Sequence, residues 1–227
     1  MLAERHGLAP GSAERLTALL EALTAEPHPP TTIRDPARAA DEHVADSLSG
    51  LEVADLRRAG RIADLGPGAG FPGLPLALAL PAASVDLVEA TTRKCEVVER
   101  LATAAGMQNT RALRLRAEEL AAGEGHEAYD VVTARALGPL VVLAEYASPL
   151  LREGGVLVAW KGARDPGEES AAAHAVDRTA MEAVEVLDVH PYPTARSRHL
   201  HVLAKAAPTP PGLPRRPGMA RKRPLSS

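Results

Sequence analysis

Aromatic residues and cysteine are almost absent from this sequence. It contains one Phe, one Trp and three Tyr among 227 residues, so a hydrophobic core has to be built from Leu, Val, Ile and Ala. The single cysteine, Cys95, cannot form an internal disulfide, and no group of Cys and His has the spacing of a zinc site. These absences exclude a disulfide scaffold and predict no metal, and Cys95 is expected to be a small buried hydrophobe.

Long apolar runs are missing too. No stretch approaches the roughly 20 apolar residues that would span a bilayer. The first residues, M-L-A-E-R-H-G, contain no apolar region of the kind found in signal peptides. We therefore expect a soluble, cytoplasmic protein with no membrane partner. With 227 residues and 45% hydrophobic content, one domain with short extensions is the simplest prediction.

Acidic residues are missing from the last part of the chain. None follows Asp188, whereas eight of the 26 basic residues do, which leaves 18 basic against 29 acidic residues up to that point, a net charge of −11. A negative body with a positive tail indicates a polyanionic partner. A solvated, disordered basic terminus explains the charge equally well, so charge alone leaves both interpretations open.

The spacing of apolar residues predicts helices first. A helix over 12–25, with Ser12 as its N-cap, is followed by one that starts at Pro36 and runs to about Leu48, and by a turn or helix over 51–58. Alternating elements follow. Strands are predicted at 61–65, 84–89, 110–115, 129–135, 154–161, 182–189 and 198–205, and helices at 74–80, 93–106, 117–122, 139–150 and 166–180.

Five successive strand–helix units predict a parallel sheet with helices on both faces. The last two strands have no helix between them and are expected to form an antiparallel pair at one edge. The predicted fold is therefore α/β and Rossmann-like, with a mostly parallel seven-stranded sheet. We divide the chain into an N-terminal helical extension (1–58) packed on the core, the core itself (59–206) and a Pro-rich basic tail (207–227).

Four glycines follow the first predicted strand, in the stretch R-I-A-D-L-G-P-G-A-G-F-P-G (61–73). A glycine-rich turn between a strand and a helix lets the backbone approach a ligand closely. Gly68, Gly70 and Gly73 also fit the dinucleotide pattern G-x-G-x-x-G, although that match is weak by itself. A tight turn with a purely structural role is the alternative.

Three features favour S-adenosylmethionine over a nicotinamide cofactor. Asp64, at the end of the strand, would repel a pyrophosphate but is placed to bind the cofactor's amino group. Pro67 and Pro72 lack the N–H donors that a diphosphate would need. Glu89 ends the second strand, where a carboxylate can accept hydrogen bonds from ribose hydroxyls, although dehydrogenases use an acid there as well. An amino-acid head, a ribose and no phosphate describe S-adenosylmethionine.

These and further stretches of the chain resemble a known family, the ribosomal RNA small-subunit methyltransferase G family, also called glucose-inhibited division protein B. The resemblance runs through nearly the whole chain in the family's order. It is carried by T-I-R-D-P…H-V-A-D-S-L (32–48), A-D-L-G-P-G-A-G-F-P-G-L-P-L (63–76), R-A-E-E-L (116–120), V-V-T-A-R-A-L (131–137), V-A-W-K-G (158–162), R-H-L-H-V (198–202) and P-R-R-P-G-M-A-R-K-R-P-L (214–225).

The resemblance implies a class I S-adenosylmethionine-dependent methyltransferase that modifies N7 of a guanine at position 527, in the 530 loop of 16S ribosomal RNA. The implied partner is 16S rRNA, the 30S subunit or an assembly intermediate, and a monomer is expected. Cofactor contacts are expected at Asp64, Gly66, Gly68, Gly70, Phe71, Glu89, Ala117, Glu118 and Arg135. The alternative for Glu118 is the acidic first turn of a helix.

The chain departs from the family in three places. It reads P-T-T-I before the R-D-P segment, it has Glu89 where Asp is frequent, and its tail has a Pro-rich insertion at 208–214. These departures bear more on RNA affinity than on catalysis.

Three basic residues, Arg116, Arg135 and Lys161, match family positions that face the cofactor and the RNA, and they are the candidate catalytic residues. Guanine N7 has a lone pair and no proton, so it needs no general base. We expect Arg135 and Lys161 to hold phosphate, guanine O6 or the cofactor carboxylate, because a cation beside N7 would oppose the charge that methylation creates. The alternative is that they are ordinary cations at the edge of the sheet.

RNA binding is expected to depend on basic residues and to be sensitive to salt, because few aromatic residues are available for stacking. Prolines should keep the tail extended, so that it becomes ordered only on RNA. The pair His43 and Asp46, three residues apart, favours a helix-surface hydrogen bond over a functional role. The expected RNA-binding residues are Arg198, Arg215, Arg216, Arg221, Lys222 and Arg223.

Other functions remain open from the sequence. One is an S-adenosylmethionine-dependent enzyme that acts on a small molecule, which the basic tail disfavours. Another is an NAD-dependent oxidoreductase. A third is a non-catalytic RNA-binding module that keeps a vestigial cofactor pocket.

Overall fold

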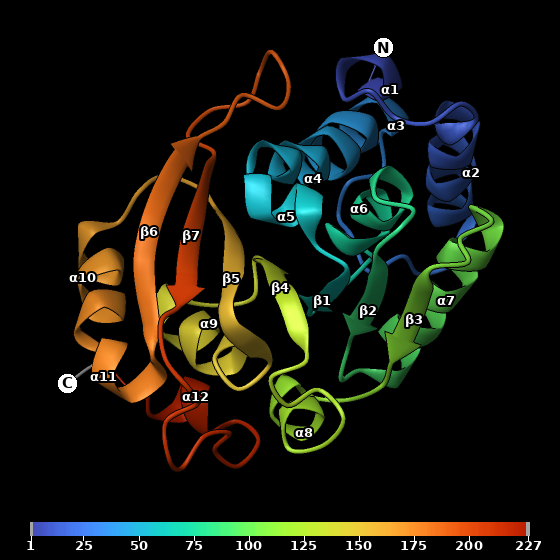
Figure 1. Cartoon of the computed structure of the whole chain (residues 1–227). Helices are drawn as coiled ribbons and strands as arrows, with labels where there is room; N and C mark the ends of the chain where they lie inside the picture. Colours follow the sequence, from blue (N-terminus) through green and yellow to red (C-terminus); the bar gives the residue numbers. More distant parts are fainter. Residues whose placement is uncertain (1, 226–227) are drawn as a thin grey trace.

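In the computed structural model, which describes residues 2–225, a seven-stranded sheet forms the centre of the fold (Figure 1). The strands lie in the order β3-β2-β1-β4-β5-β7-β6. Neighbouring strands among β1–β5 pair in parallel, and β7 runs antiparallel to both β5 and β6. The bounds are β1 (Arg61–Leu65), β2 (Ser84–Val88), β3 (Thr110–Leu113), β4 (Tyr129–Arg135), β5 (Leu151–Lys161), β6 (Met181–Asp188) and β7 (His199–Lys205). The predicted mostly parallel sheet with an antiparallel edge pair is confirmed.

The strands carry apolar side chains on both faces of the sheet, and helices cover both faces. In β1, Ile62 joins one hydrophobic cluster and the next residue, Ala63, joins the other. The first cluster includes residues from α2 and from α6 (Gly73–Ala79) and α7 (Thr92–Ala104). The second includes residues from α8, α9 and α10. The bounds of the helices after β3 are α8 (Ala117–Ala121), α9 (Leu140–Ala147), α10 (Pro166–His174) and α11 (Val176–Thr179).

The N-terminal segment is helical, as predicted, and gathers at the top of the view in Figure 1. Its leucines at helical spacing, among them Leu19 and Leu56, join the same cluster as the strands. Ser12 is not the N-cap: α2 is capped by Gly11, and Ser12 is its buried first residue. The bounds are α1 (Leu2–Arg5), α2 (Ser12–Ala25), α3 (Pro36–Ala39), α4 (Asp46–Leu48) and α5 (Ala54–Arg58).

The helix predicted from Pro36 to about Leu48 is interrupted by a wider turn. Asp35 caps its start by accepting a hydrogen bond from the Arg38 N–H (2.8 Å). A π-helical segment, η1 (Ala40–Ala45), then separates α3 from α4, and a 3₁₀ turn, η2 (Ser49–Glu52), follows α4. Such π segments occur frequently at functional sites, and this one contains His43 and leads directly into Asp46.

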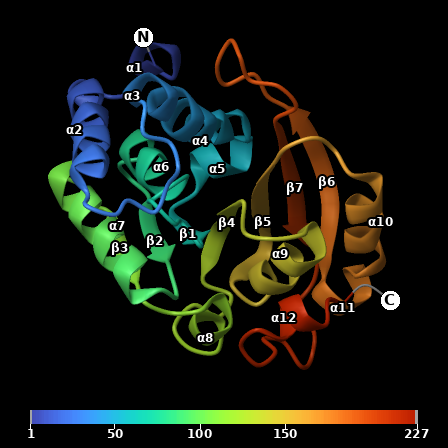
Figure 2. The ribbon, with the colours of Figure 1, turned by 180° about the vertical axis from the view of Figure 1, so that it is seen from behind.

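The basic tail packs on the core. The prediction that it stays extended and becomes ordered only on RNA differs from the structure, where residues 219–222 form helix α12 (Met219–Lys222) beside α9 (Figure 2). Ala220 and Leu225 are buried in the second hydrophobic cluster, and Arg215 forms an ion pair with the buried Glu145. These contacts anchor the tail without RNA. The division of the chain into three parts stays a prediction.

None of the helices in residues 2–225 has the length and apolar character that a membrane span requires.

Candidate functional site

A cavity of about 380 Å³ opens where β1, β2, β3 and β4 end. Carboxyl ends of parallel strands meet at one edge of a sheet, and ligands of open α/β sheets bind there. The cavity is within the size range of small-molecule sites. It is lined by Gly66 after β1, Glu89 after β2, Ala117 at the start of α8 and Leu137 after β4. The predicted cofactor residues Gly66, Glu89, Ala117 and Glu118 are therefore brought together.

The turn after β1 needs glycine because its backbone is left-handed. Gly66, Gly68 and Gly70 have φ angles of 65°, 60° and 92°. A Cβ atom on Gly66 would lie only 2.7 Å from the end of the Leu137 side chain, which would have to shift, and a larger residue would also be strained by the left-handed backbone. Of these three glycines, Gly66 alone lines the cavity, and Gly68 and Gly70 shape the turn.

Asp64 lies beneath this turn, outside the cavity. Its side chain is fully buried and accepts hydrogen bonds from the Gly73 N–H (2.7 Å) and the Thr133 hydroxyl (2.9 Å). Side chains alternate along a strand, and Asp64 points to the face covered by α6. The structure therefore differs from the prediction that Asp64 meets the cofactor's amino group. Burial raises the pKa of this carboxyl to about 6.

Two buried carboxylates lie in the wall of the cavity. Glu89 accepts a hydrogen bond from the Thr91 N–H (2.9 Å), and Glu118 accepts one from the Gly218 N–H (2.7 Å). Both lie where the sequence predicts, because each follows a strand end. Such a wall suits a ligand that carries hydroxyl groups and positive charge.

A second cavity, of about 370 Å³, adjoins the first. Ala136, directly after β4, lines both cavities and has a left-handed backbone with φ of 54°. The predicted residues Arg135, Lys161 and Arg198 lie in this second cavity, together with His43 and Asp46. Arg116 lies at the wall of the first cavity instead. The three candidate catalytic cations are therefore divided between the two cavities.

Arg135 is held by groups from the N-terminal extension. Its Nη1 donates to Asp46 Oδ2 (2.8 Å) and to the Glu42 carbonyl (3.1 Å). His43 stacks on Phe71, with ring centroids 4.5 Å apart, and the Arg135 guanidinium lies 5.7 Å from the centre of the Phe71 ring. Burial, together with the Arg135 charge, lowers the pKa of His43 to about 4, so this imidazole is neutral at pH 7.

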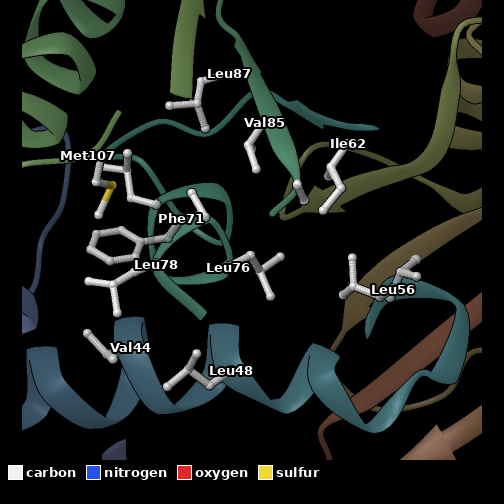
Figure 3. Close-up of a cluster of buried hydrophobic side chains, with 14 of the residues drawn as sticks. Val44, Leu48, Leu56, Ile62, Phe71, Leu76, Leu78, Val85, Leu87 and Met107 are labelled. Atoms are coloured by element: carbon white, nitrogen blue, oxygen red, sulfur yellow. The ribbon is translucent and has the colours of Figure 1, made fainter. Parts of the chain in front are cut away.

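Phe71 belongs to the hydrophobic core. Only 3% of it is exposed, and Figure 3 shows its ring close to Met107 and Leu78, above the helix that carries Val44. The ring does not line the first cavity. This placement differs from the cofactor contact that the resemblance implies, and Phe71 instead supports His43.

Asp46 contacts residues from three other parts of the chain in the second cavity. Its Oδ2 pairs with Arg135, its backbone carbonyl accepts from the Trp160 indole N–H (2.8 Å), and Arg198 Nε lies 3.6 Å from Oδ1. Among the described residues, Oδ1 is buried without a hydrogen-bond partner. The sequence predicts only a helix-surface hydrogen bond for His43 and Asp46, whereas both residues line the second cavity. Their spacing shows that they share a helix face but not what covers that face.

Lys161 is fixed against α9 and α10. Its Nζ donates to Glu168 Oε1 (2.5 Å) and to the Gly138 carbonyl (3.2 Å). The same Glu168 oxygen accepts from the Leu140 N–H at the start of α9 (2.6 Å). The Lys161 charge is therefore paired with Glu168, although Lys161 also lines the second cavity.

The six predicted RNA-binding residues lie in different environments. Arg215 pairs with Glu145, and Arg221 Nη2 donates to the Leu137 carbonyl (2.6 Å) in the wall of the first cavity. Arg198 lies between Asp46 and the Tyr192 hydroxyl. Arg221 is exposed, as are Arg216, Lys222 and Arg223, which line neither cavity. The prediction for Cys95 is confirmed, as 5% of it is exposed.

Comparison with known proteins agrees with this geometry. Archaeal fibrillarins share the fold: the pre-rRNA processing protein of Methanococcus jannaschii has a TM-score of 0.56 at 19% identity, over 72% of this chain and 74% of that one. The Aeropyrum pernix protein, which has natively bound S-adenosyl-L-methionine, has a TM-score of 0.55 at 18% identity, over 70% and 73%. These similarities confirm the predicted Rossmann-like α/β fold with a mostly parallel sheet.

Sequence relatives are closer. Ribosomal RNA small subunit methyltransferase G from Chloroflexus aggregans is 41% identical over 197 residues, which is 86% of this chain and 82% of the relative. The same enzyme from Syntrophomonas wolfei is 37% identical over 185 residues, 82% of this chain and 86% of the relative. The family model of rRNA small subunit methyltransferase G matches residues 13–200. The chain therefore belongs to the rRNA small subunit methyltransferase G family.

Proposed function

We propose that this protein transfers a methyl group from S-adenosylmethionine to N7 of a guanine in 16S rRNA, at position 527 in the 530 loop. The observation that best supports this function is the pair of cavities that meet at Ala136. The first would hold the cofactor and the second the flipped base, so that donor and acceptor meet where the cavities join. Membership of the family supports this assignment.

The first cavity fits S-adenosylmethionine. Gly66 lets the backbone form its floor, and Glu89 can accept hydrogen bonds from ribose hydroxyls. The cofactor has two positive groups and no phosphate, and the buried carboxylates of Glu89 and Glu118 match that charge. When bound, the cofactor supplies an activated methyl group.

The second cavity fits a guanine base. Guanine carries both donors and acceptors on its edges. The cavity offers donors on Arg135, Lys161 and Arg198 and acceptors on Glu42 and Asp46. An unstacked base can also lie against planar side chains, and the His43 ring and Trp160 provide such surfaces.

The charges around the second cavity suit reaction at N7 without a general base. N7 has no proton to lose, and methylation leaves positive charge on the purine. His43 is neutral at pH 7, and Asp46 balances the charge of Arg135. The residues therefore act by holding the base close and aligned, which can contribute several kcal/mol to lowering the barrier.

The direct test uses methyl-labelled S-adenosylmethionine with 30S subunits that lack the modification. Borohydride–aniline treatment cleaves RNA at 7-methylguanosine, and we expect a single cleavage at position 527. A parallel arm with free 16S rRNA shows whether the substrate is the particle or the naked RNA. Cofactor binding without label in either RNA would contradict the proposal and favour a small-molecule substrate or a non-catalytic RNA-binding protein.

The setting of this activity follows from its substrate. Ribosomal subunits are assembled in the cytoplasm, and we place the protein there. We also propose that it acts as a monomer without a metal, since the transfer needs neither a second chain nor a Lewis acid in this scheme.

A further inference from the structure

The basic tail forms one wall of the first cavity. Gly218 and Arg221 line it together with residues that follow four strands of the sheet. Both come from the last part of the chain, about 80 residues beyond Leu137, which lies on the same wall. The tail therefore belongs to the cofactor site as much as to any RNA-binding surface.

Several contacts fix the tail at this place. The Gly218 N–H donates to the buried Glu118, and Arg215 pairs with Glu145, of which 3% is exposed. Ala220 and Leu225 are buried on either side of Arg221. These contacts hold the backbone on both sides of Arg221, and its exposed side chain is directed to the cavity by the hydrogen bond from Nη2 to the Leu137 carbonyl (2.6 Å).

Arg221 lies at the β1–β4 side of the cavity. Its guanidinium donates to the Leu137 carbonyl, and the Leu137 side chain lies against Gly66. The other cations of the cavity follow different strands: Lys94 is in the helix after β2, and Arg116 follows β3. Arg221 is the cation of the cavity that contacts the chain after β4, at the other end of the strand order β3-β2-β1-β4 from Arg116.

The cofactor has a single anionic group, the carboxylate of its methionine part. The proposed function puts the ribose at Glu89 after β2; we place the adenine at Ala117 after β3, so that the methionine part extends toward β1 and β4. We propose that Arg221 binds this carboxylate. The inference rests on the proposed function for the identity of the cofactor and for the ribose at Glu89, and it assigns Arg221 to cofactor recognition where the sequence predicted RNA contact. A guanidinium is well suited to a carboxylate, because its two N–H groups match the two oxygens.

Paired ligands test this assignment. Decarboxylated S-adenosylmethionine keeps the sulfonium, amine, ribose and adenine and lacks only the carboxylate. We expect isothermal titration calorimetry to show that the wild-type protein prefers S-adenosylmethionine over this analogue by about 10- to 100-fold, as one charge-assisted hydrogen-bonded pair provides. Arg221→Ala should weaken binding of S-adenosylmethionine and leave binding of the analogue nearly unchanged, so that the preference falls about tenfold or more.

Arg216→Ala is the matched control, because Arg216 is an exposed arginine of the same tail that lines neither cavity. It should keep the wild-type preference between the two ligands. If Arg221→Ala weakens both ligands equally, or neither, the assignment is wrong and Arg221 is only part of the wall. Label transfer to rRNA by the wild-type protein tests the proposed function separately, so the two failures can be told apart.

Discussion

The two cavities are assembled in different ways. The first is built mainly from short turns that directly follow strands, and its residues are neighbours of recognisable sequence patterns. The second brings together the N-terminal extension, β4, β5 and the start of β7, with Asp46 and Arg198 separated by 152 positions. One cavity thus depends on local turn geometry and the other on long-range packing of paired charges.

This difference matches the two ligands that we propose for the cavities. The cofactor is the same molecule in many methyltransferases, so a fixed set of turns is enough to bind it. A base within a particular RNA needs a surface of its own, and in our proposal that surface includes residues of the N-terminal helices, outside the strand–helix units. The predictions below test whether the two cavities are as separable as their construction indicates.

The largest effect is expected at Asp46. Asp46→Ala removes an acceptor from the second cavity and leaves Arg135 without its carboxylate partner, and breaking such a pair lowers the free energy of unfolding by on the order of 3 kcal/mol. Arg135 is then no longer held in place, and because misplacing a positioning group by about 1 Å can cost on the order of 100-fold in rate, we expect single-turnover methyl transfer to fall by about 100-fold. Calorimetry should show S-adenosylmethionine affinity within a factor of about two of wild type. Asp41→Asn, on the same helical segment and outside both cavities, is the control. Equal losses of cofactor binding and of turnover would show that the cavities are not separable.

The second prediction concerns Asp64 beneath the glycine turn. Its carboxyl has a pKa of about 6 in the folded protein against 3.8 ordinarily, so the folded state holds the proton more tightly. The resulting penalty is absent below about pH 4, grows as pH rises, and is complete above about pH 6, where it amounts to about 3 kcal/mol.

Asp64→Asn cannot ionise, so the variant should lack this pH dependence. Urea unfolding of both proteins at several pH values between 4 and 7 measures it. We expect the wild-type free energy of unfolding to decrease relative to that of the variant as pH rises. A constant difference across this range would mean that Asp64 ionises in the folded protein as it does in water.

Glu89 tests the first cavity with a smaller effect. Glu89→Gln keeps the size of the side chain and removes the charge, and loss of a charged acceptor for ribose hydroxyls should weaken S-adenosylmethionine binding by about tenfold. Binding of rRNA, measured by filter retention without cofactor, should not change. Glu96→Gln, on the exposed face of α7, is the control. A weakened RNA complex with normal cofactor affinity would reverse the assignment of the two cavities.

The smallest effect is expected from the exposed cations of the tail. Replacing Arg216 and Lys222 by Ala should weaken rRNA binding several-fold and reduce the slope of log affinity against log salt by about one to two. The Arg215→Ala variant offers a contrast, since Arg215 is engaged with Glu145 and its loss should lower stability more than the salt slope. An unchanged slope after the double replacement would show that RNA binds elsewhere.

The sequence was sufficient for most of the fold and for about half of the site. Strand–helix alternation located the sheet, and a residue that follows a parallel strand, such as Glu89, necessarily lies at the edge where ligands bind. Asp64 was harder because the direction of a side chain depends on where the strand ends, and a shift of one residue reverses it.

Long-range contacts account for what the sequence could not provide. His43 and Asp46 share a helix face, but only the folded chain shows that this face lies against Arg135 and Phe71. The tail was predicted to be extended because its prolines and charges dominate its composition. Two apolar residues there, Ala220 and Leu225, which make no periodic pattern, pack on the core together with the ion pair of Arg215 with Glu145 and the hydrogen bond from Gly218 to Glu118.

The place of Gly218 and Arg221 in the cavity wall has a consequence for folding. The seven strands in residues 2–225 all precede residue 206, so the sheet and the turns that follow its strands form without the tail. The first cavity is complete only once Gly218 and Arg221 have docked against residues about 80 or more positions earlier in the sequence, which is a non-local step. A stop codon shortly before position 218 would therefore leave these strands in place and the first cavity open on one side.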